Sequence, residues 1–301
     1  MSANGISTHS PKSERRDLKL ALASAKRQGK TVATDGTITG SLDSTKPYYR
    51  PYNVYTSPGT VSPAEGHPWT TTPTYSFVTS GAILYLDAGN AASYTSGTTW
   101  TDLSSNNNDA TLVGSPAFTD AGTDSYFSFN GSTQYAPVTT SKMNVTLTGK
   151  TTMFVIRTVN ANTANATYRN LFGGSGNARN FNTYMRHVSG STWQMQFSTG
   201  PNSPWAGPIS SSFTVTDNKW IVVAVTQTTG GVVTYYVNGQ QIGTPATGIT
   251  FSQFINSGIE AVARSDNYWR GDIAVAAVYS RALSSAEILQ NHNSIIGRYG
   301  L

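Results

Sequence analysis

From residue 78 onward the sequence consists of short runs in which apolar and polar side chains alternate, and turn residues separate these runs. Successive side chains of a β-strand point to opposite faces, so the alternation indicates strands that are buried on one face. Many short strands at this spacing are typical of an antiparallel sandwich or jelly roll. The predicted strands are Ile83–Asp87, Tyr126–Phe129, Thr152–Arg157, Trp193–Phe197, Trp220–Val225, Val232–Val237 and Gly271–Tyr279.

Turn and cap signals support the same fold class. Asn130-Gly131 and Asn238-Gly239 each stand between strand-like runs, and Asn-Gly is the strongest short signal for a tight β-hairpin. After the last strand, residues 283–292 predict one helix, with Ser284 or Ser285 as the cap and Glu287 placed to close a capping box on Ser284. We therefore expect an all-β sandwich with a single late helix.

The first 50 residues carry the whole excess of positive charge. They hold nine Lys/Arg and four Asp/Glu, whereas residues 51–301 hold eleven of each. Residues 11–28 predict a basic helix, because apolar side chains recur at helical spacing from Leu18 to Ala25. A charge asymmetry of this kind marks an interaction arm, and a solvated basic tail is the alternative. No aromatic residue precedes Tyr48, which argues against a stacking platform for nucleic acid.

Residues 30–77 show little periodicity and contain prolines every few residues from Pro47 to Pro73. Proline at this spacing forbids a continuous helix and disfavours a central strand. The many tyrosines make a plain linker improbable on composition. We expect an extended Pro/Tyr-rich arm, which divides the chain into an anchoring segment, 1–77, and a sandwich domain, 78–301.

The composition excludes several other classes. The chain has no cysteine, so it is neither disulfide-stapled nor a thiolate metal protein. Met1–Ser10 is polar, and the one early apolar run is short and contains Lys19. We expect no signal peptide and no membrane insertion.

Six segments, taken in order, carry a family resemblance. They include a W-x-D-x-S-x-N-x-N turn, F-N-G and V-N-G hairpins, and a closing Y-x-R-A-L-S-x-x-E-I corner. The segments are Tyr85–Asn90, Trp100–Leu112, Phe129–Tyr135, Tyr236–Gly239, Trp269–Ala274 and Val278–Ile288. Together they resemble the laminin-G-like branch of the concanavalin-A-like lectin/glucanase superfamily. The resemblance implies a concanavalin-A-like jelly roll.

The N-terminal part resembles a more specific group of proteins. The opening Ala3–Thr8, the basic helix and the arm that ends in Gly66–Trp69 look like virion structural proteins of cyanobacterial phages. This resemblance implies a bacteriophage component in the virion, assembled in the host cytoplasm, as a capsid decoration, neck or tail/fibre protein. Its expected partners are other virion proteins, further copies of itself and host cell-surface polysaccharide, without nucleic acid.

Catalysis is not expected. Glucanases of the resembled superfamily carry two glutamates on one strand, because retaining hydrolysis needs two carboxyl groups roughly 5 Å apart. The four glutamates, Glu14, Glu65, Glu260 and Glu287, form no such pair, and the four histidines lack metal-ligand spacing. Two alternatives to the virion hypothesis stay open: a free-standing laminin-G-like carbohydrate-binding module, and an atypical glycan hydrolase.

Three candidate sites follow. Aromatic platforms with planar polar side chains suit glycans, and the predicted set is Arg186, Trp193, Trp205, Asn267, Tyr268, Trp269 and Arg270, unless the tryptophans are core residues. The resemblance implies calcium at Asp102, Asn106, Asn108 and Asp109, although such residues also stabilise turns. The predicted anchoring residues are Arg15, Arg16, Leu18, Leu22, Lys26, Arg27, Tyr48, Tyr49, Tyr52, Tyr55 and Trp69.

Overall fold

The computed structural model describes residues 75–138, 145–158, 168–173, 182–198, 207–251, 261–263 and 267–301, and two short strands near the N-terminus. The chain divides into two compact units, residues 1–74 and 75–301. In the first unit, β1 (Thr31–Val32) and β2 (Ile38–Thr39) pair antiparallel. The predicted basic helix, the Pro/Tyr-rich arm and all eleven predicted anchoring residues lie outside the described residues.

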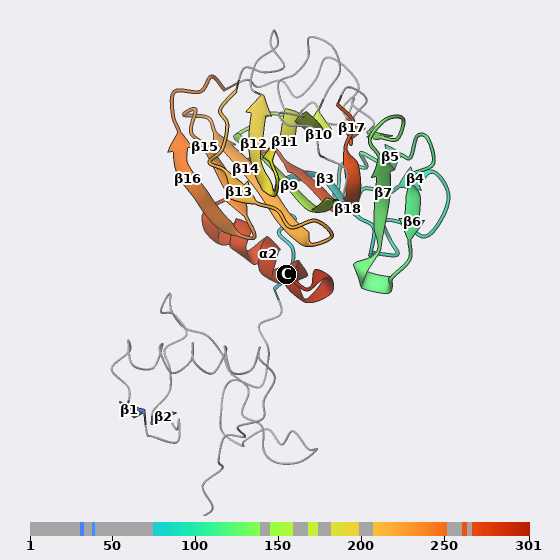
Figure 1. The fold of residues 1–301 in the computed structure, drawn as a ribbon, viewed down its shortest axis with the longest axis horizontal. Helices are drawn as coiled ribbons and strands as arrows, with labels where there is room; N and C mark the ends of the chain where they lie inside the picture. Colours follow the sequence, from blue (N-terminus) through green and yellow to red (C-terminus); the bar gives the residue numbers. More distant parts are fainter. Residues whose placement is uncertain are drawn as a thin grey trace, which may run out of the picture. The chain divides into compact units, whose positions relative to one another are not determined.

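The second unit is a β-sandwich whose larger sheet has eight strands, all paired antiparallel (Figure 1). Its strands in spatial order are β16 (Gln240–Ala246), β15 (Val233–Val237), β14 (Trp220–Thr228), β9 (Gly149–Thr158), β18 (Arg270–Tyr279), β7 (Tyr126–Asn130) and β6 (Ala117–Thr119). The remaining strand, β3 (Ala82–Asp87), pairs with the second half of β18.

The smaller sheet has six strands and packs on one face of the larger one. In spatial order they are β13 (Phe213–Thr214), β12 (Thr192–Ser198), β11 (Asn182–Ser189), β10 (Tyr168–Gly173), β17 (Ala261–Val262) and β8 (Ala136–Pro137). A separate two-stranded ribbon joins β4 (Thr99–Trp100) to β5 (Ala110–Thr111). The predicted all-β sandwich is confirmed.

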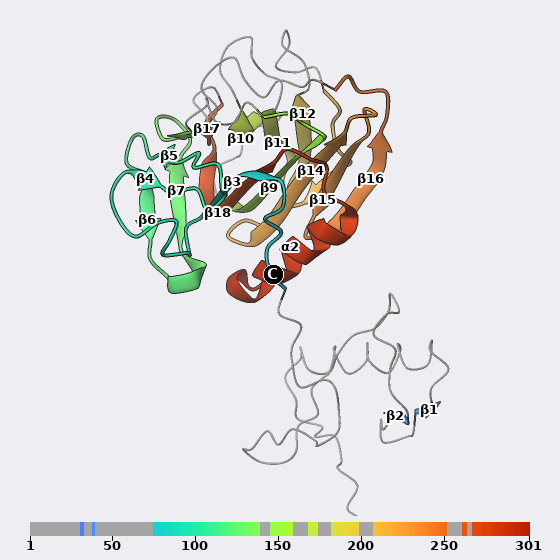
Figure 2. The ribbon, with the colours of Figure 1, turned by 180° about the vertical axis from the view of Figure 1, so that it is seen from behind.

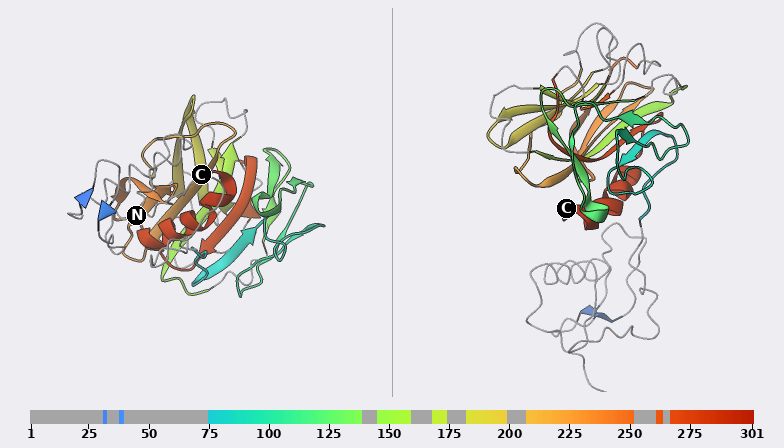
Figure 3. Two further views of the ribbon diagram at one scale, coloured as in Figure 1. Left: turned by 90° about the horizontal axis from the view of Figure 1, so that it is seen from below. Right: turned by 90° about the vertical axis from the view of Figure 1, so that its right-hand side faces the viewer.

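The larger sheet is apolar on both faces. Phe154 and Ile156 of β9 point into the core between the sheets, while Met153 and Val155 point to the opposite face. That opposite face is covered by α2 (Ser285–Tyr299), which lies across the strands in Figures 2 and 3. Among the described residues, no helix is long and apolar enough to span a membrane.

The predicted start of the helix is confirmed, and its predicted end is wrong. Ser284 accepts the backbone N–H of Glu287, and the Glu287 side chain accepts the backbone N–H of Ser284. The helix runs past His292 to Tyr299 and ends at Gly300, which has a φ of 63°. The extension follows because the apolar stripe continues through Ile295 to Tyr299, which keeps the last two turns packed on the sheet.

The first residues of the sandwich are tied to this helix by a buried amide. Asn291 accepts the backbone N–H of Val78 at 2.6 Å and donates to the Tyr279 hydroxyl at 3.0 Å. That hydroxyl donates in turn to the Val78 carbonyl oxygen at 2.7 Å. Each polar group of the triangle is satisfied inside the fold, so the chain enters the domain at a fixed position.

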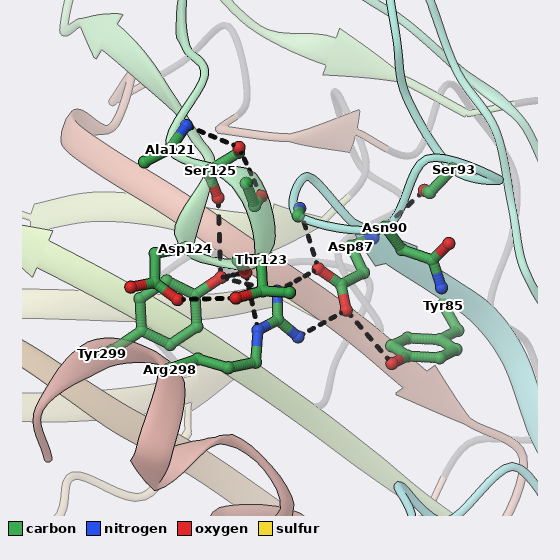
Figure 4. A network of polar contacts seen from close by, with 12 residues as sticks. Tyr85, Asp87, Asn90, Ser93, Ala121, Thr123, Asp124, Ser125, Arg298 and Tyr299 are labelled. Atoms are coloured by element: carbon green, nitrogen blue, oxygen red, sulfur yellow. Dashed lines mark hydrogen bonds and ion pairs between the residues drawn. The ribbon is translucent and has the colours of Figure 1, made fainter.

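The last turn of α2 is fastened to β3 by an ion pair (Figure 4). Both terminal nitrogens of Arg298 donate to the Asp87 carboxylate at 2.7 Å, and the Arg298 Nε donates to the Thr123 carbonyl oxygen at 2.7 Å. The Asp87 side chain is 3% exposed and also accepts the Tyr85 hydroxyl at 3.4 Å. Paired and hydrogen-bonded in this way, a buried carboxylate is stable, but either charge alone would be costly.

We predict that Arg298→Ala lowers the free energy of unfolding by about 3 kcal/mol, because it leaves the Asp87 carboxylate buried without its counter-charge. Arg281→Ala is the matched control, since Arg281 pairs with Glu287 on the same helix and both side chains are partly exposed. Arg281 holds the pKa of Glu287 at about 2, yet a pair near solvent contributes at most about 1 kcal/mol. Urea titrations of the three proteins measure both values, and equal losses would contradict the assignment.

Candidate functional site

The outer face of the smaller sheet, which points away from the core, collects polar side chains. In the register of the sheet, Tyr168 stands opposite Arg186, and Arg186 stands opposite Gln194. Their neighbours in β11 and β12, Met185 and Met195, point into the core. Because side chains alternate along a strand, Tyr168, Arg186 and Gln194 form a row on the outer face.

A second row follows two residues further along the strands. Asn170 stands opposite Tyr184, and Tyr184 stands opposite Gln196. These three residues are buried, with exposed fractions of 0%, 0% and 1%, whereas the first row is only partly buried. We call the two rows together with Asn182 the outer polar face.

Contacts between these side chains hold them in place. Arg186 donates to the Gln194 side-chain oxygen at 2.7 Å, and its guanidinium lies 5.6 Å from the centre of the Tyr168 ring. The Tyr168 ring meets Tyr184 edge-on at 6.2 Å, and Asn182 donates to the Tyr184 hydroxyl at 2.7 Å. The face therefore presents the partly exposed Tyr168 ring beside amide and guanidinium groups, and the buried Tyr184 ring supports it from below.

Gly173 at the end of β10 makes room for this arrangement. A Cβ at that position would lie 1.9 Å from the side-chain oxygen of Asn182, and the backbone has a φ of 153°. Any larger residue would displace Asn182, and with it the hydrogen bond that positions the Tyr184 hydroxyl.

On the outer polar face, Asn170 and Arg186 have buried polar atoms without a hydrogen-bond partner in the described structure. They are the side-chain nitrogen and oxygen of Asn170 and the Nε of Arg186. Leaving a buried donor or acceptor unsatisfied costs about 1–3 kcal/mol for each group. Such atoms are rare in folded proteins, and these belong to side chains on the neighbouring strands β10 and β11.

The structure corrects the predicted aromatic platform at two positions. Trp193 is 2% exposed and Trp269 is 0% exposed, and both rings lie in the core between the sheets. Buried rings offer no stacking surface, so neither tryptophan can serve as a platform in this fold. Trp205 lies outside the described residues.

The other predicted residues lie on or beside the outer polar face. Arg186 belongs to its first row. The Asn267 carbonyl oxygen accepts the backbone N–H of Asn170 at 2.7 Å, and Tyr268 forms a bridge with the same residue. Arg270 is exposed at the start of β18, and its charge, together with burial, lowers the pKa of Arg169.

Sequence reasoning missed most of the outer polar face. Tyr168, Asn170, Tyr184, Gln194 and Gln196 were not among the predicted site residues. The available signal was the alternation of Asn182, Tyr184 and Arg186 with Thr183 and Met185. This alternation signal is weak, because tyrosine and methionine are both large and partly apolar, so the two faces of the strand differ little in polarity.

The predicted calcium residues serve as turn and strand-edge supports. Both oxygens of Asp102 accept two hydrogen bonds each, at 2.7–2.9 Å, from the backbone N–H groups of Tyr85, Ser104 and Asn108 and from the Ser104 hydroxyl. A carboxylate has about four lone-pair positions, and all four are filled. Asp102 therefore does not fit a calcium ligand.

The other three residues of the predicted calcium set also form hydrogen bonds that support the turn and the edge of β3. Asn106 and Asn108 donate to the Ala82 and Ile83 carbonyl oxygens of β3, and Asp109 accepts the backbone N–H of Asp102. These contacts cap the edge of β3 that β18 does not pair. Within the described residues, no cluster of three or more His, Asp or Glu side chains is arranged to hold a metal ion.

Comparisons with known proteins agree with this fold. Residues 130–289, more than half of the chain, match the laminin G model of the Concanavalin A-like lectin/glucanases superfamily. No curated protein matches the sequence significantly.

Similar solved structures include the receptor binding domain of botulinum neurotoxin C/D mosaic serotype, with 14% identity and a TM-score of 0.56 over 73% of this chain and 52% of that one. The binding domain of botulinum neurotoxin DC in complex with SialylT has 18% identity and a TM-score of 0.52, with 71% and 52% covered. At these identities the likeness concerns the fold, and this chain spans about half the length of the structures that it matches.

We predict that calcium leaves the melting temperature unchanged, because the Asp102 oxygens are saturated by protein donors. Asp102→Ala should lower the free energy of unfolding by about 3 kcal/mol, since it leaves several donors without a partner. Thermal and urea unfolding in calcium and in EDTA measure both effects. A calcium-dependent rise in the wild type that Asp102→Ala abolishes would contradict this assignment.

Proposed function

This chain belongs to the Concanavalin A-like lectin/glucanases superfamily, and on that premise we propose that its sandwich is a non-catalytic carbohydrate-binding domain carried by a bacteriophage virion structural protein. The observation that carries the binding role is the outer polar face. Ligand sites combine apolar or aromatic surface with a few well-placed polar groups. The face supplies one partly exposed tyrosine ring, four amides and one guanidinium on adjacent strands.

Planar polar side chains suit sugars for a simple reason. A hydroxyl group both donates and accepts, so an amide can satisfy two neighbouring hydroxyl groups, one with its nitrogen and one with its oxygen. A guanidinium can donate to two acceptors at once in a fixed geometry. The partly exposed Tyr168 ring adds a flat apolar surface beside these groups.

The buried carboxylates support a binding role rather than hydrolysis. Hydrolysis of a glycosidic bond needs one carboxyl group that donates a proton and a second one close by. The buried acidic residues of the described structure are Asp87, Asp102 and Asp272. Asp87 and Asp272 pair with arginines at 2.7 and 2.6 Å, and Asp102 accepts four protein hydrogen bonds. Each of the three carboxyl groups is therefore occupied by contacts within the fold.

The virion role has separate support. The positive excess of the chain lies in its first 50 residues, ahead of the sandwich, which suits an anchor that docks on an acidic partner. One similar solved structure is titled the receptor binding domain of botulinum neurotoxin C/D mosaic serotype. We propose that residues 1–77 attach the protein to other virion proteins, in several symmetry-related copies, and that the sandwich faces host polysaccharide.

The binding role predicts that a truncated protein of residues 75–301 retains the glycan affinity of the full chain, because the outer polar face lies wholly within it. Surface plasmon resonance on immobilised bacterial polysaccharides measures both proteins. Arg281→Ala is a suitable control, since Arg281 lies in the turn between β18 and α2 and pairs with Glu287 of the helix rather than with a residue of this face. A sandwich that binds no polysaccharide would refute the carbohydrate role.

The virion role predicts that full-length protein assembles or co-sediments with purified phage particles, whereas the 75–301 protein does not. Light scattering and sedimentation, at low and at raised salt, separate an anchored chain from a free-standing one. If the two proteins are identical monomers that ignore particles, the free-standing module is correct and the virion role is wrong.

A further inference from the structure

We propose that the outer polar face takes a saccharide unit that carries a carboxylate, with Arg186 binding the carboxylate and Asn170 binding neighbouring hydroxyl groups. This inference rests on the proposed carbohydrate role and specifies the ligand of that site. It follows from two side chains whose present contacts do not match their chemistry.

Arg186 is the first of them. Its described contacts are neutral, namely the Gln194 side-chain oxygen at 2.7 Å and the Tyr168 ring at 5.6 Å. By contrast, Arg157 and Arg298 each face a carboxylate at 2.6–2.7 Å. A partly buried guanidinium keeps its charge, so a site that surrounds it with neutral groups favours an anion.

The orientation of Arg186 leaves a particular edge for that anion. Gln194 contacts one terminal nitrogen, Nη1, and the buried Nε has no partner. A guanidinium binds a carboxylate most strongly through two parallel hydrogen bonds, and the edge formed by Nε and the other terminal nitrogen offers this geometry. The Gln194 contact holds the group in place and keeps that edge available.

Asn170 is the second. Its side chain is fully buried, and neither its nitrogen nor its oxygen has a partner in the described structure. Natural folds keep such a group only rarely, because an apolar side chain of the same shape would be more stable. An amide reserved for a ligand explains it, since one hydroxyl can donate to the oxygen while the next accepts from the nitrogen.

The sheet places the two groups at a suitable spacing. Asn170 is directly opposite Tyr184, so Arg186, two residues further along β11, is its diagonal neighbour. Diagonal partners on one face have Cβ atoms about 7–8 Å apart. One sugar ring with its substituents spans this separation. The half-exposed row of Tyr168, Arg186 and Gln194 is the side from which a ligand reaches the buried row.

The first test uses matched ligands. Polygalacturonate, alginate and polysialic acid are immobilised beside the same polymers after reduction of their carboxyl groups to alcohols. We expect the full-length protein to bind at least one acidic polymer about tenfold more tightly than its reduced form, with the difference shrinking as salt is raised. Arg186→Gln should abolish the difference. Lys219→Gln, which removes one exposed positive charge elsewhere, should preserve it.

The second test separates ligand binding from folding. Asn170→Leu keeps the shape of the side chain and removes the unsatisfied amide, so it should raise the melting temperature by about 2–4 °C while it weakens binding to the acidic polymer by about tenfold. A purely structural Asn170 would give the opposite result, a lower melting temperature. That outcome would overturn its assignment as a ligand group.

The outcomes distinguish a failure of the carboxylate inference from a failure of the proposed carbohydrate role. Equal binding to acidic and reduced polymers, or binding that Arg186→Gln leaves unchanged, overturns the carboxylate inference while the carbohydrate role stands. Binding to neutral glycans alone would also overturn the carboxylate inference and leave the carbohydrate role standing. A wild-type protein that binds none of the polymers, in either form, overturns the carbohydrate role itself.

Discussion

The larger sheet is apolar on both faces, and that single constraint organises the molecule. A sheet of this kind must be covered twice, because exposed apolar surface costs about 25 cal/mol per Å². The six-stranded sheet covers one face and α2 covers the other. In this three-layer arrangement, the outer face of the smaller sheet is where Asn170, Arg186 and their polar neighbours collect.

The covering helix is fixed at several points along its length. The capping box at Ser284 sets its start, Asn291 binds Val78 at its middle, and Arg298 binds Asp87 at its end. Fixing the helix also fixes the two central strands, β9 and β18, on which the smaller sheet packs. The outer polar face therefore lies on a rigid scaffold, and little ordering entropy would oppose the binding that we propose there.

Strands β3 and β14 and the hairpin at Asn238-Gly239 were predicted from strand-like runs and turn chemistry. The expectation that such strands are buried on one face was wrong for β14, because its side chains are apolar on both faces. β11 was missed because tyrosine alternates there with methionine, which gives little contrast. The burial of Trp269 was also missed, because residue type does not reveal the direction of a side chain. That direction depends on register with a partner strand, which is a long-range property.

Family membership and ligand choice depend on different residues of this domain. The W-x-D-x-S-x-N-x-N turn carries part of the family resemblance, and in the structure its Asp102 and Asn108 form hydrogen bonds with the free edge of β3. A motif with that role persists because the fold needs it, whatever the domain binds. The outer polar face lies on β10, β11 and β12, outside all of the family motifs. Its residues can therefore change, and the ligand with them, without disturbing the turn that holds the sandwich together.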